Sequence, residues 1–354
     1  MQALRFHGAQ DIRLDDVAEP QTQAGQVKIK VHWCGICGSD LHEYLAGPIM
    51  TPTPDAPHPL TGESMPLTMG HEFAGEIVEV GDGVEGLAIA DLVAVEPLLF
   101  CGECELCRAG DYNLCPKFGA IGVVGGGGAF AEFITVPVHL VHPLPEGVTT
   151  EQAAVAEPVC VGWHAVGRSG LRDGGSALVI GAGPIGLATL IALKARGAGF
   201  VAVADRSTGA RRDAALALGA DLFVDASSES IGDAIRAATG GLGPDVVFEV
   251  AGAQAAFDDA VDAVRPKGRI VSLAVWEKDV RIDLNRLLLK EVEIVLSLAY
   301  ANEYRVVLDA IADGRISNLD AMVTGRIPLG EVVEGGFETL IEHRDDHVKI
   351  LVHP

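Results

Sequence analysis

The sequence predicts an α/β protein of two domains, and three observations carry that prediction. The chain has 354 residues, more than a single hydrophobic core usually supports. Residues 1–150 read as short strands broken by turns, the pattern of a β-barrel-like domain. From residue 176 onward, apolar strands alternate with helical stretches, which indicates βαβ units on a doubly wound parallel sheet. We expect domains at residues 1–156 and 157–297, with residues 298–354 returning to the first domain.

Individual segments support each half of this division. The stretch QVKIKVHW, from Gln26 to Trp33, alternates apolar and polar residues and predicts a half-buried strand. Residues 45–69 hold six prolines without any periodicity, so we expect an ordered surface loop with a function. Thr149 and Gln152 have the spacing of a capping box and predict that a helix begins there. The last strand expected in the second domain is VEIVLSLAY, residues 292–300.

Composition and charge disfavour several classes of partner. Hydrophobic residues make up 49% of the chain and charged residues 21%, as in globular rather than disordered proteins. The formal net charge of -23 predicts no nucleic-acid partner and no acidic membrane surface. Residues 176–193 carry no charge, but glycines and a proline interrupt them. A buried strand followed by a buried helix is therefore favoured over a membrane span.

The seven cysteines all lie in the first half of the chain. The N-terminal sequence has neither the apolar core nor the cleavage site of a secretory signal, so we expect a cytoplasmic protein. An odd number of cysteines in such a protein favours reduced thiols, which bind a metal or take part in catalysis, over disulfides.

A glycine fingerprint indicates a nucleotide site at the start of the second domain. Gly181, Gly183 and Gly186, with Pro184 and Ile185 between them, directly follow an apolar strand and open an apolar helix. The first glycine permits the tight turn, the second lets the backbone approach a pyrophosphate, and the third lets the helix pack closely on the strand. A glycine-rich turn without a ligand is the alternative.

The residue that ends the next strand bears on the choice of coenzyme. Asp205 lies nineteen residues after Gly186, where a carboxylate can bind the ribose hydroxyls. The same carboxylate would repel a 2′-phosphate, so NAD is favoured over NADP. Arg206, Arg211 and Arg212 stand close by in the sequence and weaken that preference.

Four of the cysteines fall within fifteen residues. Their spacing, C-x2-C-x2-C-x7-C, suits tetrahedral ligation of a metal by thiolates, and a disulfide pair or an iron–sulfur cluster is the alternative. They are Cys101, Cys104, Cys107 and Cys115. A closed site of this kind leaves no room for substrate, so its expected role is to fold the loop that carries it.

A second group of possible metal ligands lies nearer the N-terminus. Cys37 and His71 are ligand types that a catalytic zinc takes, and Glu72 and Glu157 offer oxygen atoms. Taken singly, a buried cysteine and a structural histidine are more common than a pair of ligands. The surrounding motifs therefore have to decide whether Cys37 and His71 bind a metal.

The chain resembles the zinc-dependent medium-chain alcohol and polyol dehydrogenases over essentially its whole length. The matching stretches are GICGSDLH, GHEFAGEIVEVG, CGECELCRAGDYNLC, EPVCVGWHAV, VIGAGPIGL and DVVFEVAG. The proline-rich loop is most similar to the 2,3-butanediol dehydrogenase branch, next to sorbitol and threonine dehydrogenases. The resemblance implies a GroES-like catalytic domain joined to a Rossmann coenzyme domain.

The resemblance also implies two zinc ions in each chain. The four loop cysteines are expected to hold a structural zinc, and Cys37 and His71 a catalytic zinc with one position open to substrate. Glu72 and Glu157 are expected to share the remaining ligand position, one directly and one through water. Cys160 aligns with no ligand, so we expect a core thiol there.

A proton relay beside the catalytic zinc is a further implication of the resemblance. Zinc would acidify the hydroxyl of a secondary alcohol, which then transfers a hydride to the nicotinamide. Ser39 and His42 match the relay from hydroxyl to coenzyme ribose to imidazole to solvent, and a surface histidine is the alternative for His42. Asp40 matches the carboxylate that orients the zinc-bound histidine. Gly38 departs from family members with a basic residue there, so coenzyme release is expected to differ.

On the coenzyme side, the resemblance assigns Arg211 to the adenosine and Leu273 and Leu298 to the nicotinamide. Arg211 lies eight residues before Gly219, as the family's basic residue does, although its loop is one residue longer than in some relatives. For the two leucines, ordinary core positions are an equally good interpretation.

We therefore expect an NAD-dependent and zinc-dependent dehydrogenase of secondary alcohols or vicinal diols, such as 2,3-butanediol, with ketones such as acetoin in the other direction. A sorbitol-like or threonine-like dehydrogenase is the alternative within the family. A zinc-free quinone reductase would leave Cys37 and His71 without a purpose. Outside enzymes, an inactive NAD-binding structural protein is the alternative. The edge of VEIVLSLAY can pair across a twofold axis, which predicts a homodimer or homotetramer.

Overall fold

The computed structural model describes the whole chain, Met1–Pro354, which divides into two compact units. The chain passes from one unit to the other within helix α4 (Ala156–Ser169). Residues 298–303 and 313–322, which we expected to return with the first domain, group with the second unit. The first unit consists of Met1–Glu157, Tyr304–Ala312 and Val323–Pro354, and the second of Pro158–Glu303 and Asp313–Met322.

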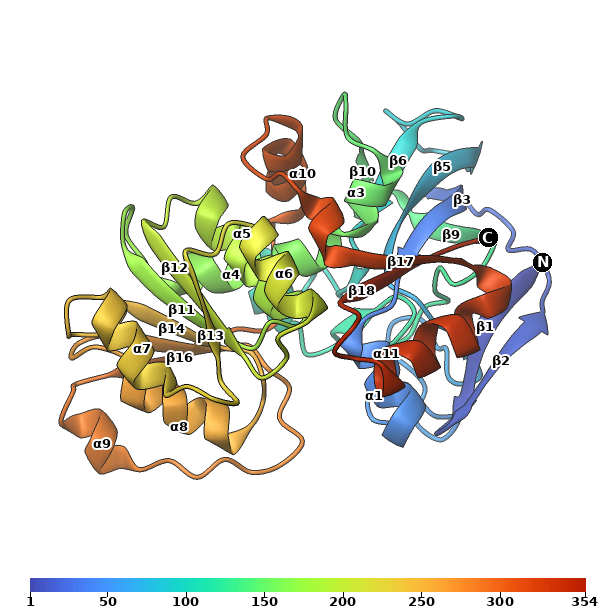
Figure 1. Ribbon diagram of the computed structural model, residues 1–354. Helices are drawn as coiled ribbons and strands as arrows, with labels where there is room; N and C mark the ends of the chain where they lie inside the picture. Colours follow the sequence, from blue (N-terminus) through green and yellow to red (C-terminus); the bar gives the residue numbers. More distant parts are fainter. The chain divides into compact units, whose positions relative to one another are not determined.

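The first unit consists mainly of antiparallel strands around one apolar core (Figure 1). A small sheet has the order β2-β1-β4, and β7 pairs with β8. The main sheet has the order β10-β6-β5-β3-β18-β17, and β9 also pairs with β3. The strands are β1 (Gln2–Gly8), β2 (Asp11–Asp16), β3 (Gln26–Gly35), β4 (Leu67–Thr68), β5 (Glu72–Val80), β6 (Leu92–Val95), β7 (Leu98–Leu99), β8 (Gly119–Ala120), β9 (Phe133–Pro137), β10 (Val141–Pro143), β17 (Val323–Pro328) and β18 (Lys349–His353).

Strand β3 organises the main sheet and confirms the strand predicted from alternation. Its pairing register with β5 shifts at two places, and such bulges bend a strand. The strand also pairs with β9 and β18. Lys28, which the alternation placed on the solvent side, is buried because its ammonium group pairs with the carboxylates of Glu19 and Glu79.

Short helical segments connect these strands. The predicted capping box is confirmed, because the Thr149 hydroxyl accepts the Gln152 N–H and the Gln152 side chain accepts the Thr149 N–H. The helical segments of the first unit are α1 (Gly38–Ala46), α2 (Glu105–Ala109), η1 (Tyr112–Leu114), η2 (Val138–Leu140), α3 (Thr150–Ala154), α10 (Tyr304–Ala312), η4 (Leu329–Glu331), η5 (Val332–Glu338) and α11 (Thr339–Glu342).

The proline-rich loop at residues 45–69 is ordered by buried polar side chains. The fully buried Glu43 carboxylate accepts the N–H groups of Ile49 (3.0 Å) and Met50 (2.6 Å). The Thr51 hydroxyl donates to the Val123 carbonyl at 3.0 Å. His58 is 3% exposed and lies against residues 118–125. The loop is therefore an anchored part of the first unit.

The second unit is a six-stranded parallel sheet of order β13-β12-β11-β14-β15-β16, which confirms the doubly wound prediction. Its strands are β11 (Ser176–Ile180), β12 (Phe200–Asp205), β13 (Leu222–Asp225), β14 (Val246–Glu249), β15 (Arg269–Ser272) and β16 (Glu293–Leu296). Its helical segments beyond α4 are α5 (Pro184–Ala195), α6 (Ala210–Ala217), α7 (Ile231–Ala238), α8 (Gln254–Ala263), α9 (Leu284–Leu288) and η3 (Leu319–Met322).

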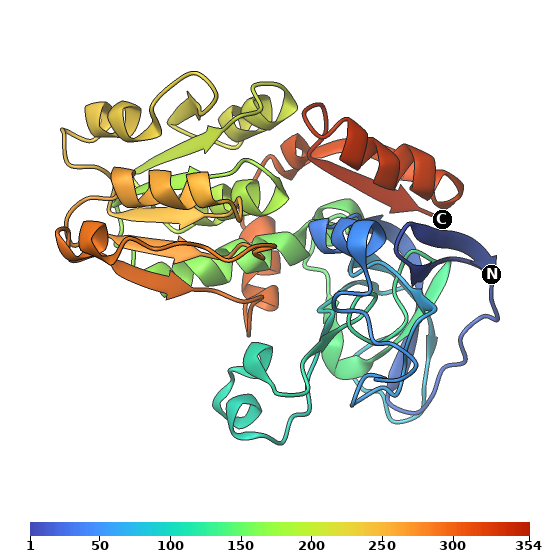
Figure 2. The same cartoon turned by 90° about the horizontal axis from the view of Figure 1, so that it is seen from below.

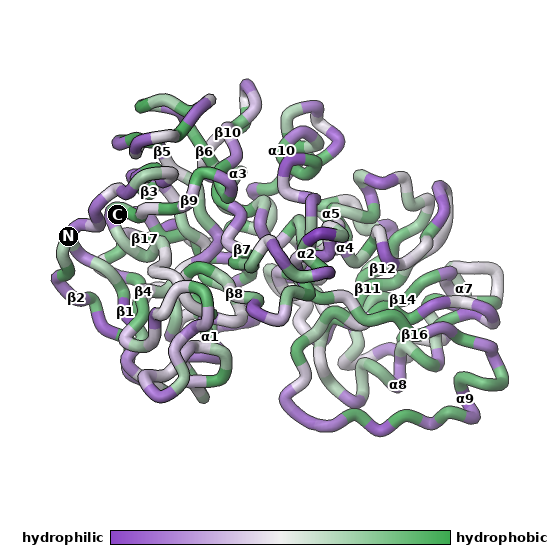
Figure 3. Tube along the Cα trace, turned by 180° about the vertical axis from the view of Figure 1, so that it is seen from behind, coloured by the Kyte–Doolittle hydropathy of each residue, from purple (hydrophilic) through white to green (hydrophobic).

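Helices cover both faces of this sheet, which explains its continuously apolar strands (Figure 3). Leu178 and Ile180 of β11 share a core with residues of α7 and α8. The alternate residues Ala177 and Val179 are equally buried, and α5 packs against β11 and β12. The uncharged stretch 176–193 is thus a strand and a helix, as predicted. No helix of the structure combines the length and the apolar character that crossing a membrane requires.

Candidate functional site

The first group of predicted metal ligands is organised by the start of helix α1. Cys37 is the N-cap of this helix, and its backbone N–H donates to Asp40 Oδ2 at 2.9 Å. The fully buried Asp40 carboxylate also faces His71, with 3.6 Å between Oδ1 and the ring nitrogen Nδ1. One carboxylate thus lies against both Cys37 and His71, which are 34 residues apart in the sequence.

His71 presents its other nitrogen to the site. Its Nε2 lies 3.4 Å from the Ser39 hydroxyl. Burial lowers the pKa of His71, but Asp40 and the Cys37 thiol raise it by more, so it lies well above its ordinary value. Neither His71 Nδ1 nor Asp40 Oδ1 has a hydrogen-bond partner. This donor set favours a cation bound by Cys37 and His71. Asp40 would then orient the His71 ring from its other side.

The ligand atoms of Cys37, His71 and Glu72 all lie within 4.8 Å of one another. A thiolate, an imidazole and a carboxylate are a donor set that zinc accepts in catalytic sites. Glu157, near the start of α4, is 7% exposed but is not one of these three. The structure therefore brings together three of the four predicted ligands of this site.

Sequence reasoning missed the residue that holds Glu72. Lys349, the first residue of β18, is fully buried, and its Nζ lies 2.7 and 2.6 Å from the two carboxylate oxygens of Glu72. The ammonium group also donates to the Ile36 carbonyl at 2.9 Å. Burial alone would lower the pKa of Lys349, but Glu72 raises it above its usual value. A lysine within the apolar run VKILV is the signal that could have revealed this ion pair.

The same ion pair explains a glycine of the GICGSDLH motif. A Cβ at Gly35 would lie 2.2 Å from Glu72 Oε2, a contact that real structures do not contain. Gly35 pairs with Glu72 across β3 and β5. Only a glycine leaves room for the carboxylate to reach Lys349.

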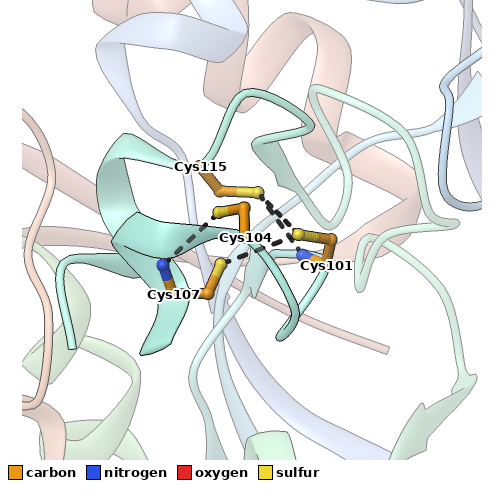
Figure 4. A group of neighbouring side chains, drawn as sticks. All are labelled: Cys101, Cys104, Cys107 and Cys115. Atoms are coloured by element: carbon orange, nitrogen blue, oxygen red, sulfur yellow. Dashed lines mark hydrogen bonds between the residues drawn. The ribbon is translucent and has the colours of Figure 1, made fainter. Parts of the chain in front are cut away.

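The four loop cysteines converge as predicted, and their sulfur atoms lie within 4.8 Å of one another (Figure 4). Cys101 Sγ lies 3.9 Å from Cys107 Sγ and 3.6 Å from Cys115 Sγ. A tetrahedral site with zinc–sulfur bonds of about 2.3 Å requires sulfur atoms about 3.8 Å apart. No disulfide joins any cysteine of the chain. The spacing of the thiols therefore fits one zinc ion.

Two of these thiols have unusual proton affinities. Backbone N–H groups of Glu103 and Cys104 lower the pKa of Cys101 to about 6. Desolvation and the neighbouring thiol of Cys104 raise the pKa of Cys107 to about 12. Thiolates at this separation repel one another, and a bound cation would offset that repulsion.

The segment of residues 101–115, here called the cysteine lobe, extends away from the sheets of the first unit (Figure 2). Tyr112 within the lobe donates its hydroxyl to Glu96 at 2.6 Å and stacks on Phe100. The other oxygen of Glu96 lies 3.3 Å from His142 Nε2 of β10. These contacts connect the cysteine lobe to the main sheet.

In the second unit, the glycine fingerprint has the predicted geometry. Gly181 has φ of +112°, which a residue with a side chain rarely adopts. A Cβ at Gly186 would lie 1.8 Å from the Gly181 carbonyl, so the helix and the turn pack too closely here for any residue but glycine. Gly183 is the N-cap of α5, Pro184 is its first residue, and the space beside Gly183 is open. The free N–H groups at this helix start suit a pyrophosphate.

Asp205 lies at the end of β12, beside the fingerprint. Its carboxylate accepts the N–H groups of Ala182 at 2.6 Å and Ser207 at 2.8 Å. Arg211 Nη1 lies 3.8 Å from Asp205 Oδ2, and the buried Nε of Arg211 has no hydrogen-bond partner. The two predicted residues for the adenosine half are therefore neighbours.

The remaining predicted residues are placed as follows. Ser39 and His42 lie three residues apart on α1 and so share one face of the helix. Leu273 follows directly after β15, and Leu298 is 53% exposed shortly after β16. The exposure of Leu298 argues against its alternative interpretation as a core leucine.

Comparison with known proteins finds two matching family models and several similar full-length proteins. Residues 23–146 match the alcohol dehydrogenase GroES-like domain, and residues 184–313 match the zinc-binding dehydrogenase family. The chain is 42% identical to an (R,R)-butanediol dehydrogenase of Bacillus subtilis over 354 residues, which covers 100% of both chains. It is 32% identical to a sorbitol dehydrogenase of the same organism, covering 100% of this chain and 97% of the relative.

The fold comparison points the same way. The crystal structure of 2R,3R-butanediol dehydrogenase from Bacillus subtilis superposes with a TM-score of 0.93 and 42% sequence identity. The match covers 100% of this chain and 99% of the other.

Proposed function

Because the chain belongs to the zinc-binding dehydrogenases with an alcohol dehydrogenase GroES-like domain, we propose that it oxidises vicinal diols of the 2,3-butanediol type with NAD and reduces the matching hydroxyketone in reverse. The observation that carries this proposal is the full-length identity of 42% to an (R,R)-butanediol dehydrogenase, in a chain whose Cys37, His71 and Glu72 converge.

Two zinc ions per chain are part of the proposal. Cys37 and His71 would hold the catalytic ion and the four cysteines of the lobe the structural one. Zinc supplies a Lewis acid that acidifies the substrate hydroxyl, and NAD supplies the hydride acceptor. Glu72 and Glu157 would share the remaining ligand position, with Lys349 holding the Glu72 carboxylate in place.

The residues around Cys37 move the proton that the alcohol loses. Ser39 Oγ, beside His71 Nε2, accepts this proton from the substrate hydroxyl. His42, on the same face of α1, passes it on, because an imidazole ring can both accept and donate a proton. Asp40 keeps the His71 ring oriented through Nδ1 and stays buried throughout.

The coenzyme is held by the carboxyl edge of the parallel sheet. The turn at Gly181–Gly186 receives the pyrophosphate, and Asp205 the ribose hydroxyls. Arg211 contacts the adenosine, and Leu273 and Leu298 flank the nicotinamide. Asp205 disfavours a 2′-phosphate, so NAD is preferred to NADP.

Assembly into a homodimer or homotetramer belongs to the same proposal. Strand β16 is the last strand of its sheet, and Leu296 is 69% exposed on it. Leu288 and Leu289, at the end of the neighbouring helix α9, are 71% and 86% exposed. A second copy pairing β16 with β16 would satisfy the open backbone edge and cover the leucines. A reducing, cytoplasmic setting fits seven cysteines of which none forms a disulfide.

A substrate panel tests the proposal. NADH formation is followed with 2,3-butanediol stereoisomers, sorbitol, threonine and simple secondary alcohols, each with NAD and NADP, and zinc content is measured alongside. We expect kcat/KM for a butanediol isomer to exceed that for sorbitol and threonine by about tenfold or more, about 1.4 kcal/mol in transition-state binding. A preference for sorbitol or threonine would contradict the substrate class. Tight NADH binding without turnover would favour a structural protein.

A further inference from the structure

Glu249, the last residue of β14, is fully buried and has no role in the chemistry derived above. Its Oε1 accepts the backbone N–H groups of Ala251 at 2.9 Å and Gly252 at 2.8 Å. Its Oε2 accepts the Ser272 hydroxyl at 3.3 Å, and Trp276 Nε1 donates to the same hydroxyl at 3.2 Å. One carboxylate thus connects the turn after β14 with the segment after β15.

The turn that Glu249 holds also touches the glycine fingerprint. The Val250 N–H donates to the Ile180 carbonyl at 3.1 Å. A Cβ at Gly181 or at Gly186 would lie 3.4 Å from Val250 Cγ2. On its other side, a Cβ at Gly252 would lie 2.9 Å from the Val275 carbonyl. Residues 250–252 are therefore wedged between the turn after β11 and the segment after β15.

These three turns lie at the carboxyl edge of the sheet, where doubly wound folds bind dinucleotides. Strands β14, β15 and β16 form the second mononucleotide-binding half, on the side of the sheet that continues from β11 away from β12. In a coenzyme site of this kind the glycine fingerprint receives the pyrophosphate, Asp205 the adenosine ribose, and the second half the nicotinamide.

We propose that Glu249 is a positioning residue that holds residues 250–252 and 272–276 in the arrangement that receives the nicotinamide half of the coenzyme. The inference rests on the proposed NAD-dependent function. Leu273 lies between Ser272 and Trp276, so the hydrogen bonds from Glu249 to Ser272 and onward to Trp276 fix the segment that carries this nicotinamide contact.

The chemistry of the position supports this role. Burial raises the pKa of Glu249, and the N–H groups of Ala251 and Gly252 lower it only in part. Burying a carboxyl group costs free energy unless its oxygens are hydrogen-bonded. Burying an apolar side chain in the same space would cost less, so packing alone does not explain a glutamate here. The position therefore needs an acceptor for two backbone N–H groups, and an uncharged amide would provide the same acceptor.

The test compares the affinities of NADH and ADP-ribose, which lacks the nicotinamide, by isothermal titration calorimetry on the full chain. Glu249→Gln keeps the acceptor, and Glu249→Ala removes it. Asp245→Ala is the matched control at the amino end of the same strand, where the Asp245 carboxylate accepts the Ser176 N–H and hydroxyl, both at 2.7 Å. Thermal unfolding of each variant reports stability separately.

For Glu249→Ala we expect the NADH dissociation constant to rise about tenfold or more, and that of ADP-ribose to change less than about threefold. For Glu249→Gln and Asp245→Ala, both constants should stay within about threefold of the unmodified chain, even where the melting temperature falls. Three results would each overturn the inference. Glu249→Ala could weaken the binding of both ligands equally, or leave NADH binding unchanged. Asp245→Ala could weaken NADH binding as much as Glu249→Ala does.

If Glu249→Ala does not fold, Ser272→Ala replaces it, because it removes the hydroxyl between Glu249 and Trp276. We then expect NADH to weaken about threefold or more relative to ADP-ribose, and no change would overturn the inference. An unmodified chain that binds no NADH would instead contradict the proposed function itself, and with it this inference.

Discussion

At the scale of single residues, the ion pair between Lys349 and Glu72 shows how the candidate metal site is supported. Both side chains are fully buried, and 277 residues separate them in the sequence. A buried carboxylate without a partner is strongly unfavourable, whereas a paired one is tolerated. Lys349 therefore gives the buried Glu72 side chain a charged partner beside Cys37 and His71.

Substituting Lys349→Met should destabilise the protein by about 3 kcal/mol or more, because Glu72 loses its only cationic partner in the structure. Urea unfolding of chelator-treated protein measures the change without a contribution from bound zinc. The double variant Lys349→Met with Glu72→Gln should recover most of the loss. If the double variant is no more stable than the single one, charge pairing is not what Lys349 contributes.

At the scale of elements, the cysteine lobe has little packing of its own to stabilise it. Helix α2 has only five residues and none of them is buried. Such a helix is not stable alone, so the lobe relies on the thiolate site and on the Tyr112–Glu96 hydrogen bond.

Substituting Cys104→Ser should lower the zinc content from two ions per chain to one and expose the lobe to proteolysis between residues 101 and 115. Cys104 is chosen because it also caps α2, where its sulfur accepts the Cys107 N–H at 3.4 Å. Cys160→Ala, at a buried thiol outside both clusters, is the matched control and should keep both ions. Atomic absorption and limited trypsin digestion provide the measurements. A Cys104→Ser protein with two zinc ions and an intact lobe would refute this assignment.

Elements differ in how far the sequence alone predicts them. The glycine fingerprint, the capping box at Thr149 and the cysteine loop are local patterns, in which the residues that meet in space are also close in the chain. Lys28, Lys349 and Glu249 could not be read in this way. Each has a partner on another strand or in a distant segment, and the register of the folded sheets determines which group that is. For Lys349 the surrounding apolar run indicates burial but does not identify Glu72 as the partner.

At the scale of the whole molecule, the edge of the parallel sheet is the face through which we propose that two chains associate. Strand β16 pairs on one side with β15 only, and Leu288, Leu289 and Leu296 are exposed around it. An open edge flanked by apolar side chains associates with another strand unless charge or a bulge prevents it. A twofold pairing closes the edge once, and assembly through this face then stops at a dimer.

Substituting Leu296→Lys should therefore convert the assembly into smaller particles, by one halving of mass, because a charged side chain would have to be buried in the apolar face that joins the two copies. The side chain is 69% exposed, so the substitution should leave the unfolding free energy of a single chain within about 0.5 kcal/mol. Leu216→Lys, at a leucine 44% exposed on α6 and away from β16, is the matched control. Light scattering after size-exclusion chromatography measures the mass of each variant over a range of concentrations. No other strand of the second unit combines an open edge with so many exposed leucines, which is why β16 is tested. The interface at β16 would be excluded if the unmodified chain were monomeric at every concentration. It would also be excluded if the Leu296→Lys protein kept the mass of the unmodified assembly.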